Sequence, residues 1–380
     1  MKIAIIGGGI GGLTTAIALR QRGLNADVYE AAPEITAAGA GIMLPPNAMA
    51  VLGRLGVAEA VRAQGFVLEA GELRDTRDGL LQRFDLAGGN GRPDMTTLAI
   101  HRARLQRILV AQLPAAALHV GRRCAAIVEA ADGALIRFTD GTEMLADIVI
   151  GADGLRSVAR EMVRPGVPLR SAGQTAYRGV ARMRLAEPML RGGCELWGPG
   201  LRFGYGAIAR DEVYWFGTFD VEAGEQDDSG RVRARVAALF ADFPTPVPSL
   251  IAATGEAQII RTDLFDFKPM RPWHCGRVVL IGDAAHASTP NLGQGGAQAI
   301  EDAWVLADQL SHGGDPTFAF EVYEELRAAK ARYVVERSWQ FGKVAHLSNP
   351  FVRRIRNGLM RFTPESVARK QMEWLFRLNY

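Results

Sequence analysis

Three glycines placed between a short apolar run and a helical pattern constrain the fold of this chain more than any other feature. Ile3–Ile6 is rich in β-branched residues and predicts a short strand covered on both faces. Gly7, Gly9 and Gly12 follow directly, and residues 13–22 form an Ala- and Leu-rich helical pattern. A second predicted strand comes next, so the chain opens with a βαβ unit, whose natural outcome is a parallel sheet.

The spacing of these glycines suits the phosphates of a dinucleotide. Gly7 permits the tight turn, Gly9 lets the backbone approach a pyrophosphate, and Gly12 lets the helix pack closely on the strand. The helix N-terminus offers free amides and the positive end of its dipole. Glu30 ends the second predicted strand, eighteen residues after Gly12, where a carboxylate accepts hydrogen bonds from an adenosine ribose. The motif alone does not distinguish NAD from FAD.

Two later motifs narrow the choice of cofactor. The first spans residues 151–160 and begins with Gly-Ala-Asp-Gly directly after an apolar strand pattern. The second spans residues 277–286, reads RVVLIGDAAH, and continues through Pro290 into a Gly-Gln-Gly-Gly turn and a helical pattern. With the N-terminal glycines, these segments resemble the three ordered signatures of the class A flavoprotein monooxygenases, the para-hydroxybenzoate hydroxylase-like family. The resemblance covers nearly the whole chain.

This resemblance implies a fold, a cofactor and a reaction. The implied fold is α/β, with a Rossmann-like FAD-binding domain, an inserted antiparallel-sheet substrate domain and C-terminal helices. The implied reaction is hydroxylation of an aromatic or heteroaromatic substrate with NADH or NADPH and O2, through a flavin 4a-hydroperoxide. The chain is most similar to the short salicylate-, hydroxynicotinate- and urate-hydroxylase-like members. The sequence leaves open the substrate and the choice between NADH and NADPH.

The resemblance and the local sequence together indicate which residues would hold FAD. Asp283 ends a predicted strand where a ribityl hydroxyl would lie, and the glycine-rich turn after Pro290 aims backbone amides at the flavin's pyrimidine edge. Asp153 and Gly154 match a family Asp-Gly motif, and Arg102 matches an arginine that contacts FAD in relatives. The predicted cofactor-binding residues are Gly7, Gly9, Gly12, Glu30, Arg102, Asp153, Gly154, Gly282, Asp283, Gly293, Gln294, Gly295 and Gly296.

Aromatic residues alternate through the middle of the chain, at about residues 176–220, and predict an antiparallel sheet. We expect the substrate between this sheet and the flavin. There an arginine would pair with a carboxylate or phenolate, and a tyrosine would hydrogen-bond a ring hydroxyl. Core packing is the competing interpretation for each aromatic residue. The catalytic candidates are Pro290, Arg202 and Tyr205, and the substrate-binding candidates are Met43, Tyr177, Arg178, Tyr214 and Trp215.

The order of the motifs predicts a discontinuous domain organisation. The predicted FAD-binding domain comprises residues 1–75, 97–175 and 270–345, and the predicted substrate-binding sheet domain comprises residues 76–96 and 176–269. Residues 346–380 form a C-terminal helical segment with arginines among apolar residues: Arg353, Arg354, Arg356, Arg361 and Arg369. We interpret these arginines as the solvated face of a packed helix, with an anionic membrane or a protein partner as the alternative.

Composition argues against several classes of protein. The 380-residue chain has a formal net charge of +3, which gives no reason to expect a nucleic-acid partner. Its three cysteines are far apart in the sequence and indicate a reducing compartment. The sequence predicts no membrane span, no signal peptide and no metal site. We therefore expect a cytoplasmic monomer or homodimer that binds a small aromatic substrate, O2 and NAD(P)H.

Two other functions are compatible with the sequence. One is an FAD-dependent epoxidase that acts on a non-aromatic substrate. The other is a flavin-binding sensor without turnover. The Trp-x-Trp-x-Ile-Pro signature of flavin-dependent halogenases is absent from the sequence. Oxygen uptake on addition of a substrate would distinguish among these possibilities.

Overall fold

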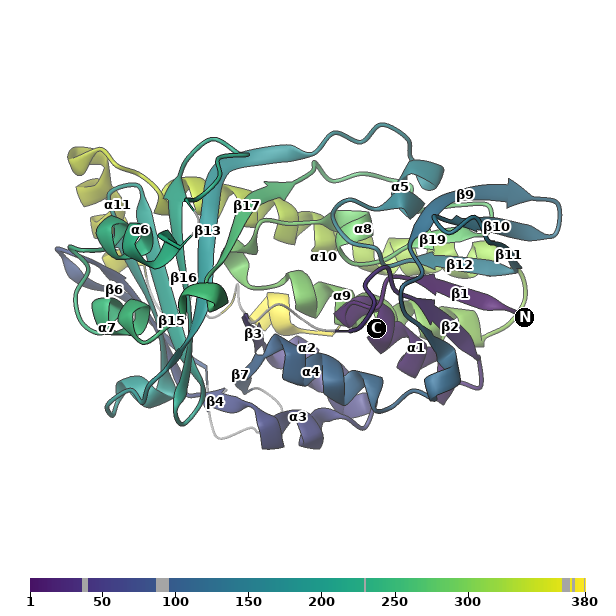
Figure 1. Ribbon diagram of the computed structural model, residues 1–380, viewed down its shortest axis with the longest axis horizontal. Helices are drawn as coiled ribbons and strands as arrows, with labels where there is room; N and C mark the ends of the chain where they lie inside the picture. Colours follow the sequence, from purple (N-terminus) through teal and green to yellow (C-terminus); the bar gives the residue numbers. More distant parts are fainter. Residues whose placement is uncertain (36–39, 87–95, 229, 364–369, 371–372, 379) are drawn as a thin grey trace.

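The computed structural model describes all residues except 36–39, 87–95, 229, 364–369, 371–372 and 379. Two large sheets stand toward opposite ends of the molecule, with helices α8 (Asp283–His286), α9 (Gly295–Ser311) and α10 (Pro316–Ala345) between them (Figure 1). The division into domains stays a prediction, and much of the predicted segment 76–96 lies outside the described residues.

The N-terminal glycine motif lies at the end of a six-stranded, mostly parallel sheet with the order β18-β19-β12-β1-β2-β8. The strands are β1 (Ile3–Ile6), β2 (Ala26–Tyr29), β8 (Leu118–His119), β12 (Ile148–Gly151), β18 (His274–Cys275) and β19 (Val278–Leu280). β18 pairs antiparallel with β19, and the other pairs are parallel. All four residues of β1 are buried, as its β-branched run predicted.

Small residues bring the helix after the glycine motif, α1 (Ile10–Gln21), against α9. A Cβ added at Gly11 would lie 3.2 Å from the Cβ of Ala299, so the two helices approach closely here. α9 also packs on α10 and on α2 (Pro46–Arg54). The helix that follows the Gly-Gln-Gly-Gly turn is therefore held on several sides.

The second large sheet has seven strands in the order β17-β13-β16-β15-β14-β5-β6. The strands are β5 (Ala70–Asp75), β6 (Gly79–Asp85), β13 (Arg170–Arg182), β14 (Gly192–Gly198), β15 (Leu201–Ala209), β16 (Glu212–Asp220) and β17 (Ile260–Asp266). Its pairs are antiparallel, as predicted, except that β14 and β5 are parallel. One face forms an apolar cluster with α6 (Val232–Leu239) and α7 (Val247–Ala252), so the other face is turned toward α9 and the predicted cofactor-binding motifs (Figure 1).

Two small sheets and three helices complete the part of the chain around the motifs. One sheet has the order β3-β7-β4 and the other has the order β11-β10-β9. Their strands are β3 (Gly41–Leu44), β4 (Phe66–Leu68), β7 (Thr97–His101), β9 (Cys124–Ala130), β10 (Gly133–Phe138) and β11 (Glu143–Ala146). The helices are α3 (Ala58–Gln64), α4 (Arg102–Val110) and α5 (Val158–Val163).

The C-terminal part of the chain crosses the molecule twice. α10 spans thirty residues, and α11 (Pro350–Phe362) then packs beside β6 at the edge of the seven-stranded sheet. Figure 1 shows the C-terminus back at the centre, close to α1 and α9. None of the described helices combines the length and apolar character that a membrane span requires.

Candidate functional site

The glycine turn is tightly packed on one side and open on the other. Gly7 has a φ of +111°, and a Cβ there would lie 2.4 Å from the carbonyl oxygen of Ala152. A Cβ at Gly12 would lie 2.0 Å from the carbonyl oxygen of Gly7. At Gly9, by contrast, no atom of the described chain comes within 4 Å of a Cβ position. Room at this helix N-terminus is what a pyrophosphate would need.

The N-terminus of α1 and Glu30 border the open side of the turn. Among the described residues no side chain caps α1, so its first amides and positive dipole end are available to an anion. The Gly8 amide donates to Oε2 of Glu30 at 2.7 Å, and the Ala32 amide donates to Oε1 at 2.8 Å. Since each carboxylate oxygen has a further lone pair, Glu30 fixes the turn and can still accept from a ribose hydroxyl.

Asp283 and Arg102 lie close enough together for the charge of Arg102 to act on the Asp283 carboxyl. The Asp283 side chain is accessible, yet burial raises its pKa, against the opposing charges of His286 and Arg102. The structure therefore places these two predicted FAD contacts near each other, and their contact with FAD stays a prediction.

The Gly-Gln-Gly-Gly turn reaches the same region. Pro290 is exposed and begins the short 3-10 turn Pro290–Leu292, after which Gly293 adopts a left-handed φ of +63°. Met43 lies next to this turn, with its Cε 3.5 Å from the position of a Cβ at Gly293. Gln294 is the N-cap residue of α9, and no described side chain caps that helix. The amides of α9 are thus available to an electron-rich group.

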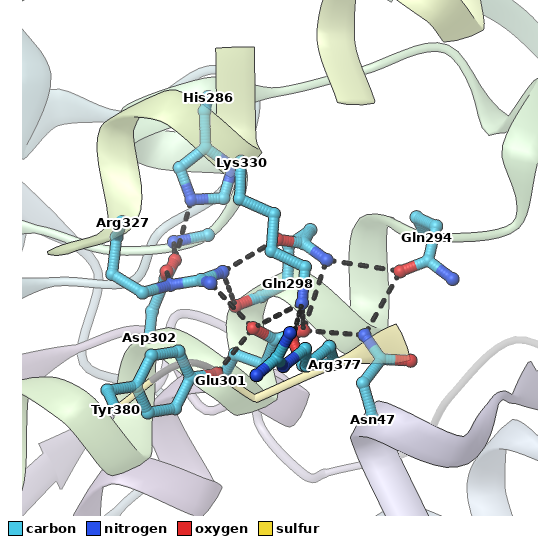
Figure 2. A network of polar contacts seen from close by, with 11 residues as sticks. Asn47, His286, Gln294, Gln298, Glu301, Asp302, Arg327, Lys330, Arg377 and Tyr380 are labelled. Atoms are coloured by element: carbon cyan, nitrogen blue, oxygen red, sulfur yellow. Dashed lines mark hydrogen bonds and ion pairs between the residues drawn. The ribbon is translucent and has the colours of Figure 1, made fainter. Parts of the chain in front are cut away.

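A buried polar network holds α9 in place, and we call it the Glu301 network (Figure 2). Glu301 is fully buried, and its carboxylate accepts hydrogen bonds from Asn47, Gln298, Arg327, Lys330 and Tyr380. The Asn47 and Gln298 amides also donate to Oε1 of Gln294, at 3.2 and 3.1 Å. The network therefore extends to Gln294, the N-cap residue of α9.

Asp302 ties α9 to the Gly-Asp turn of the third motif. Its Oδ2 accepts the Gly282 amide at 2.8 Å and lies 2.6 Å from Nε2 of His286. Nε of Arg327 donates to Oδ1 at 2.8 Å. Burial opposes ionisation, but the charges of His286 and Arg327 hold the pKa of Asp302 well below its usual range. Asp302 is therefore an anion at neutral pH and fixes the backbone just before Asp283.

Arg178 and Tyr214 lie on the face of the seven-stranded sheet that points toward the flavin-binding turn. The Tyr214 ring packs so closely on β3 that a Cβ at Gly41 would lie 2.4 Å from its Cγ. Burial raises the pKa of Tyr214, while a hydrogen bond from Arg178 and the nearby charge of Arg102 oppose the rise. Among the described residues, no ion pair joins Arg178 to a carboxylate. Arg178 therefore offers positive charge in this region.

Three of the residues predicted to contact the substrate lie on the opposite face of the seven-stranded sheet. Tyr177, Tyr205 and Trp215 lie in the apolar cluster against α6 and α7, and Tyr177 and Trp215 have no exposed surface. Successive residues of a strand point to opposite faces, so Trp215 is turned away from the face that carries Tyr214. The predicted roles of Tyr177, Tyr205 and Trp215 at the substrate are therefore wrong. These residues stabilise the sheet instead.

Arg202 lies on the flavin-facing side, but protein groups already use its donors. Its Nε donates to Oε1 of Glu195 at 2.7 Å, and its Nη1 donates to Oδ1 of Asn291 at 2.5 Å. The side chain is almost completely buried, between the rings of Phe216 and Phe341. Arg202 thus holds Asn291, the residue after Pro290, through a hydrogen bond. A catalytic role for Arg202 stays a prediction.

The Asp153-Gly154 motif lies on the packed side of the glycine turn. Oδ2 of Asp153 accepts the amides of Val158 and Ala159, at 2.7 and 3.1 Å, and thereby caps α5. The preceding residue, Ala152, is the one that a Cβ at Gly7 would strike. Direct contact of Asp153 and Gly154 with a cofactor stays a prediction.

The sequence reasoning missed the residues that support α9 from outside the motifs. Asn47, Arg327, Lys330 and Tyr380 come from α2, α10 and the C-terminal end of the chain. The one available signal was the pair of adjacent carboxylates, 301 and 302, inside an otherwise apolar helical pattern. In the part of the chain that the structure describes, no group of His, Cys, Asp and Glu side chains is placed to hold a metal ion.

Comparisons with known proteins find similarity over almost the whole chain. A family model described as "FAD binding domain" matches residues 1–338. Aurachin C monooxygenase/isomerase from Stigmatella aurantiaca is 37% identical over 362 residues, which cover 95% of this chain and 94% of that protein. 3-Amino-4-hydroxybenzoate 2-monooxygenase from Streptomyces cremeus is 35% identical over 385 residues, with 99% and 95% covered.

A solved structure gives the same result for the fold. Klebsiella pneumoniae HpxO complexed with FAD and uric acid superposes with a TM-score of 0.90 at 31% identity. The superposition covers 99% of this chain and 96% of HpxO. The arrangement of sheets and helices described above is therefore shared with that complex.

Proposed function

The chain belongs to the FAD-binding-domain family of FAD-dependent aromatic monooxygenases, and on this premise we propose that it hydroxylates an aromatic ring bearing an ionisable oxygen. The predictions of FAD as the cofactor and of an FAD- and NAD(P)H-dependent monooxygenase are confirmed by the family match and the relatives. The nature of the ring substituent is our own inference, and it rests on Arg178.

The residues at the glycine turn, at Asp283 and at the N-terminus of α9 fit FAD. We assign the pyrophosphate to the α1 N-terminus beside Gly9 and the adenosine ribose to Glu30. Asp283 would accept from the ribityl chain, and the N-terminus of α9 would face the pyrimidine edge. When bound, FAD supplies the transfer of electrons from NAD(P)H to O2 and the transfer of oxygen to the ring. The chain supplies binding, orientation and exclusion of water.

Arg178 is the observation that carries the substrate assignment. It lies on the face of the sheet turned away from α6 and α7 and is only partly buried, whereas Arg202, on the same face two strands away, is enclosed by protein partners. A guanidinium that no described carboxylate neutralises favours an anionic or strongly polarised oxygen of the ligand. Much of the surrounding face is apolar, as a flat ring requires: Leu68, Ile208, Val180 and Phe66.

Tyr214 would orient the same oxygen. Its hydroxyl accepts from Arg178, and burial raises its pKa, so that the phenol keeps its proton at neutral pH. The retained proton can be donated to the substrate oxygen while Arg178 holds the negative charge. We propose that Arg178 and Tyr214 together set the position of the ring, with Met43 packing against it from β3.

The test measures NAD(P)H oxidation and product formation by the purified, FAD-loaded protein. Aromatic acids and phenols are compared with their methyl esters or methyl ethers. Arg178→Met should raise KM for an ionisable substrate by roughly 10- to 100-fold, as expected for a lost charged hydrogen bond. It should leave the KM of the methylated analogue nearly unchanged. Arg210→Met is the matched control, because Arg210 lies exposed in the turn between β15 and β16. Equal effects of Arg178→Met on both analogues would refute the assignment.

A further inference from the structure

The helix α11 presents its polar face to the protein and its apolar face to solvent. Its inward-facing residues are buried, and they include Arg353, Arg356 and Asn357. Its outward-facing residues are Phe351, Ile355, Leu359 and Phe362, with 73, 50, 68 and 87% of their surfaces exposed. Surface helices normally have the opposite arrangement, because burial of apolar side chains drives their packing.

The buried carboxylate of Asp75 explains why α11 cannot turn its apolar face inward. Arg353 and Arg356 both donate to Oδ2 of Asp75, at 2.9 and 3.2 Å, and Asp75 is almost fully buried in β5. Asn357 donates to Asp78 at 2.7 Å. Rotating the helix would remove both arginines from the buried Asp75 carboxylate and leave its charge without a cation, which is strongly unfavourable. The orientation of α11 is therefore fixed by ion pairs.

The outward residues form a continuous stripe, since positions 351, 355, 359 and 362 recur at one helical face. We call this surface the α11 stripe. Arg354 is exposed along one side of it, and so is Arg361, which donates to the backbone carbonyl of Leu80. The sequence of α11 contains no acidic residue. The stripe thus combines exposed aromatic and aliphatic side chains with uncompensated positive charge.

We propose that the α11 stripe docks this protein on an anionic lipid surface. An apolar helical face flanked by arginines inserts at the boundary between headgroups and acyl chains, while the arginines pair with anionic headgroups. Figure 1 shows α11 at one end of the molecule, beside β6, where it can meet a flat surface. This mode of attachment is peripheral and requires no membrane-spanning helix.

The charges argue against a second copy of the chain as the occupant. A two-fold contact through this helix would bring Arg354 and Arg361 of one copy close to the same residues of the other copy. No carboxylate on α11 is available to offset that repulsion. An anionic bilayer meets both requirements of the stripe, because it buries apolar side chains and neutralises the arginines.

The experiment is sedimentation of the full chain, loaded with FAD, with vesicles of mixed phosphatidylglycerol and phosphatidylcholine or of phosphatidylcholine alone. Wild type should bind the anionic vesicles, and added salt should weaken the binding. Replacing Leu359 and Phe362 together by Ser should raise the lipid concentration for half-binding by at least tenfold. Arg354→Glu should raise it by roughly tenfold. Phe318→Ser is the matched control, since Phe318 on α10 is 68% exposed outside the stripe.

Thermal melting and FAD content of each variant show whether the fold is kept. If the double variant loses either, Phe362→Ser alone replaces it, because Phe362 is the most exposed member of the stripe. Wild type that stays in the supernatant with anionic vesicles would overturn the proposal. So would equal binding to neutral vesicles, or equal losses in the stripe variants and in Phe318→Ser. A dimer that buries the stripe and binds no vesicles would assign this surface to a second copy instead.

Discussion

Replacing Asp302 by Asn tests whether the ion pairs between α9 and α10 hold the Gly-Asp turn in place. Asp302 is fully buried and is paired with Arg327 and His286. Removing one partner of a buried ion pair costs about 3–5 kcal/mol. We expect the lower end, about 3 kcal/mol, because Arg327 keeps its partner Glu301. For a chain of 380 residues this lowers Tm by about 4 °C.

The assay is thermal melting by circular dichroism together with the FAD content after gel filtration. FAD retention should fall in Asp302→Asn, because the Gly282 amide loses its carboxylate acceptor just before Asp283. Asp308→Asn is the matched control on the same helix. Asp308 is partly exposed and pairs with Arg22 at 3.3 Å, so its loss should cost less than about 1 kcal/mol. Equal Tm values and equal FAD contents for the two variants would refute the reasoning.

Three further predictions follow from the same geometry. Gly12→Ala should abolish FAD retention, since the added Cβ would lie 2.0 Å from the Gly7 carbonyl oxygen; FAD content after gel filtration checks this. Tyr214→Phe should raise KM for an ionisable aromatic substrate, whereas Tyr177→Phe, on the other face, should lower Tm and leave KM unchanged. Burial raises the folded-state pKa of Asp283, so its ionisation destabilises the FAD-free protein as pH rises above the unfolded pKa of about 3.9. The Tm of FAD-free Asp283→Asn should therefore exceed that of wild type by an amount that grows as the pH rises above about 4, and a constant difference would contradict this.

The local motifs could be read from the sequence because their physics is local. The spacing of Gly7, Gly9 and Gly12 between a strand and a helix is a local pattern, and the structure places the turn between β1 and α1 as predicted. The glycine-rich turn after Pro290 likewise lies directly before a helix, α9, as predicted. The prediction that Asp283 ends a strand is wrong, because Asp283 begins α8, three residues after the last residue of β19. These elements also carry the family resemblance, which the comparisons confirm.

The side of the sheet on which each aromatic lies could not be predicted. Alternation predicts that Tyr214 and Trp215 point to opposite faces, but it does not say which face is toward the flavin. That depends on where α6 and α7 pack, and they bury Tyr177 and Trp215. Arg202 could not be distinguished from Arg178 either, since its partner Asn291 lies far away in the sequence.

Long-range ion pairs account for the other failures of the sequence reasoning. The Glu301 network joins α9 to α2, to α10 and to Tyr380, and no periodic pattern reports such pairs. The expectation of a solvated arginine face at the C-terminal end is wrong for Arg353 and Arg356, because the buried Asp75 draws both inward. Arg369 lies outside the described residues.

The most direct test of the proposed function is oxygen-isotope labelling with the aromatic compound that most accelerates NAD(P)H oxidation by the FAD-loaded protein. Under ¹⁸O-labelled dioxygen in unlabelled water, the account predicts a product heavier by one labelled oxygen atom, formed in proportion to the NAD(P)H consumed. Release of all the oxygen as hydrogen peroxide, or a product that takes its new oxygen from water, would contradict the assignment of this chain as an aromatic monooxygenase.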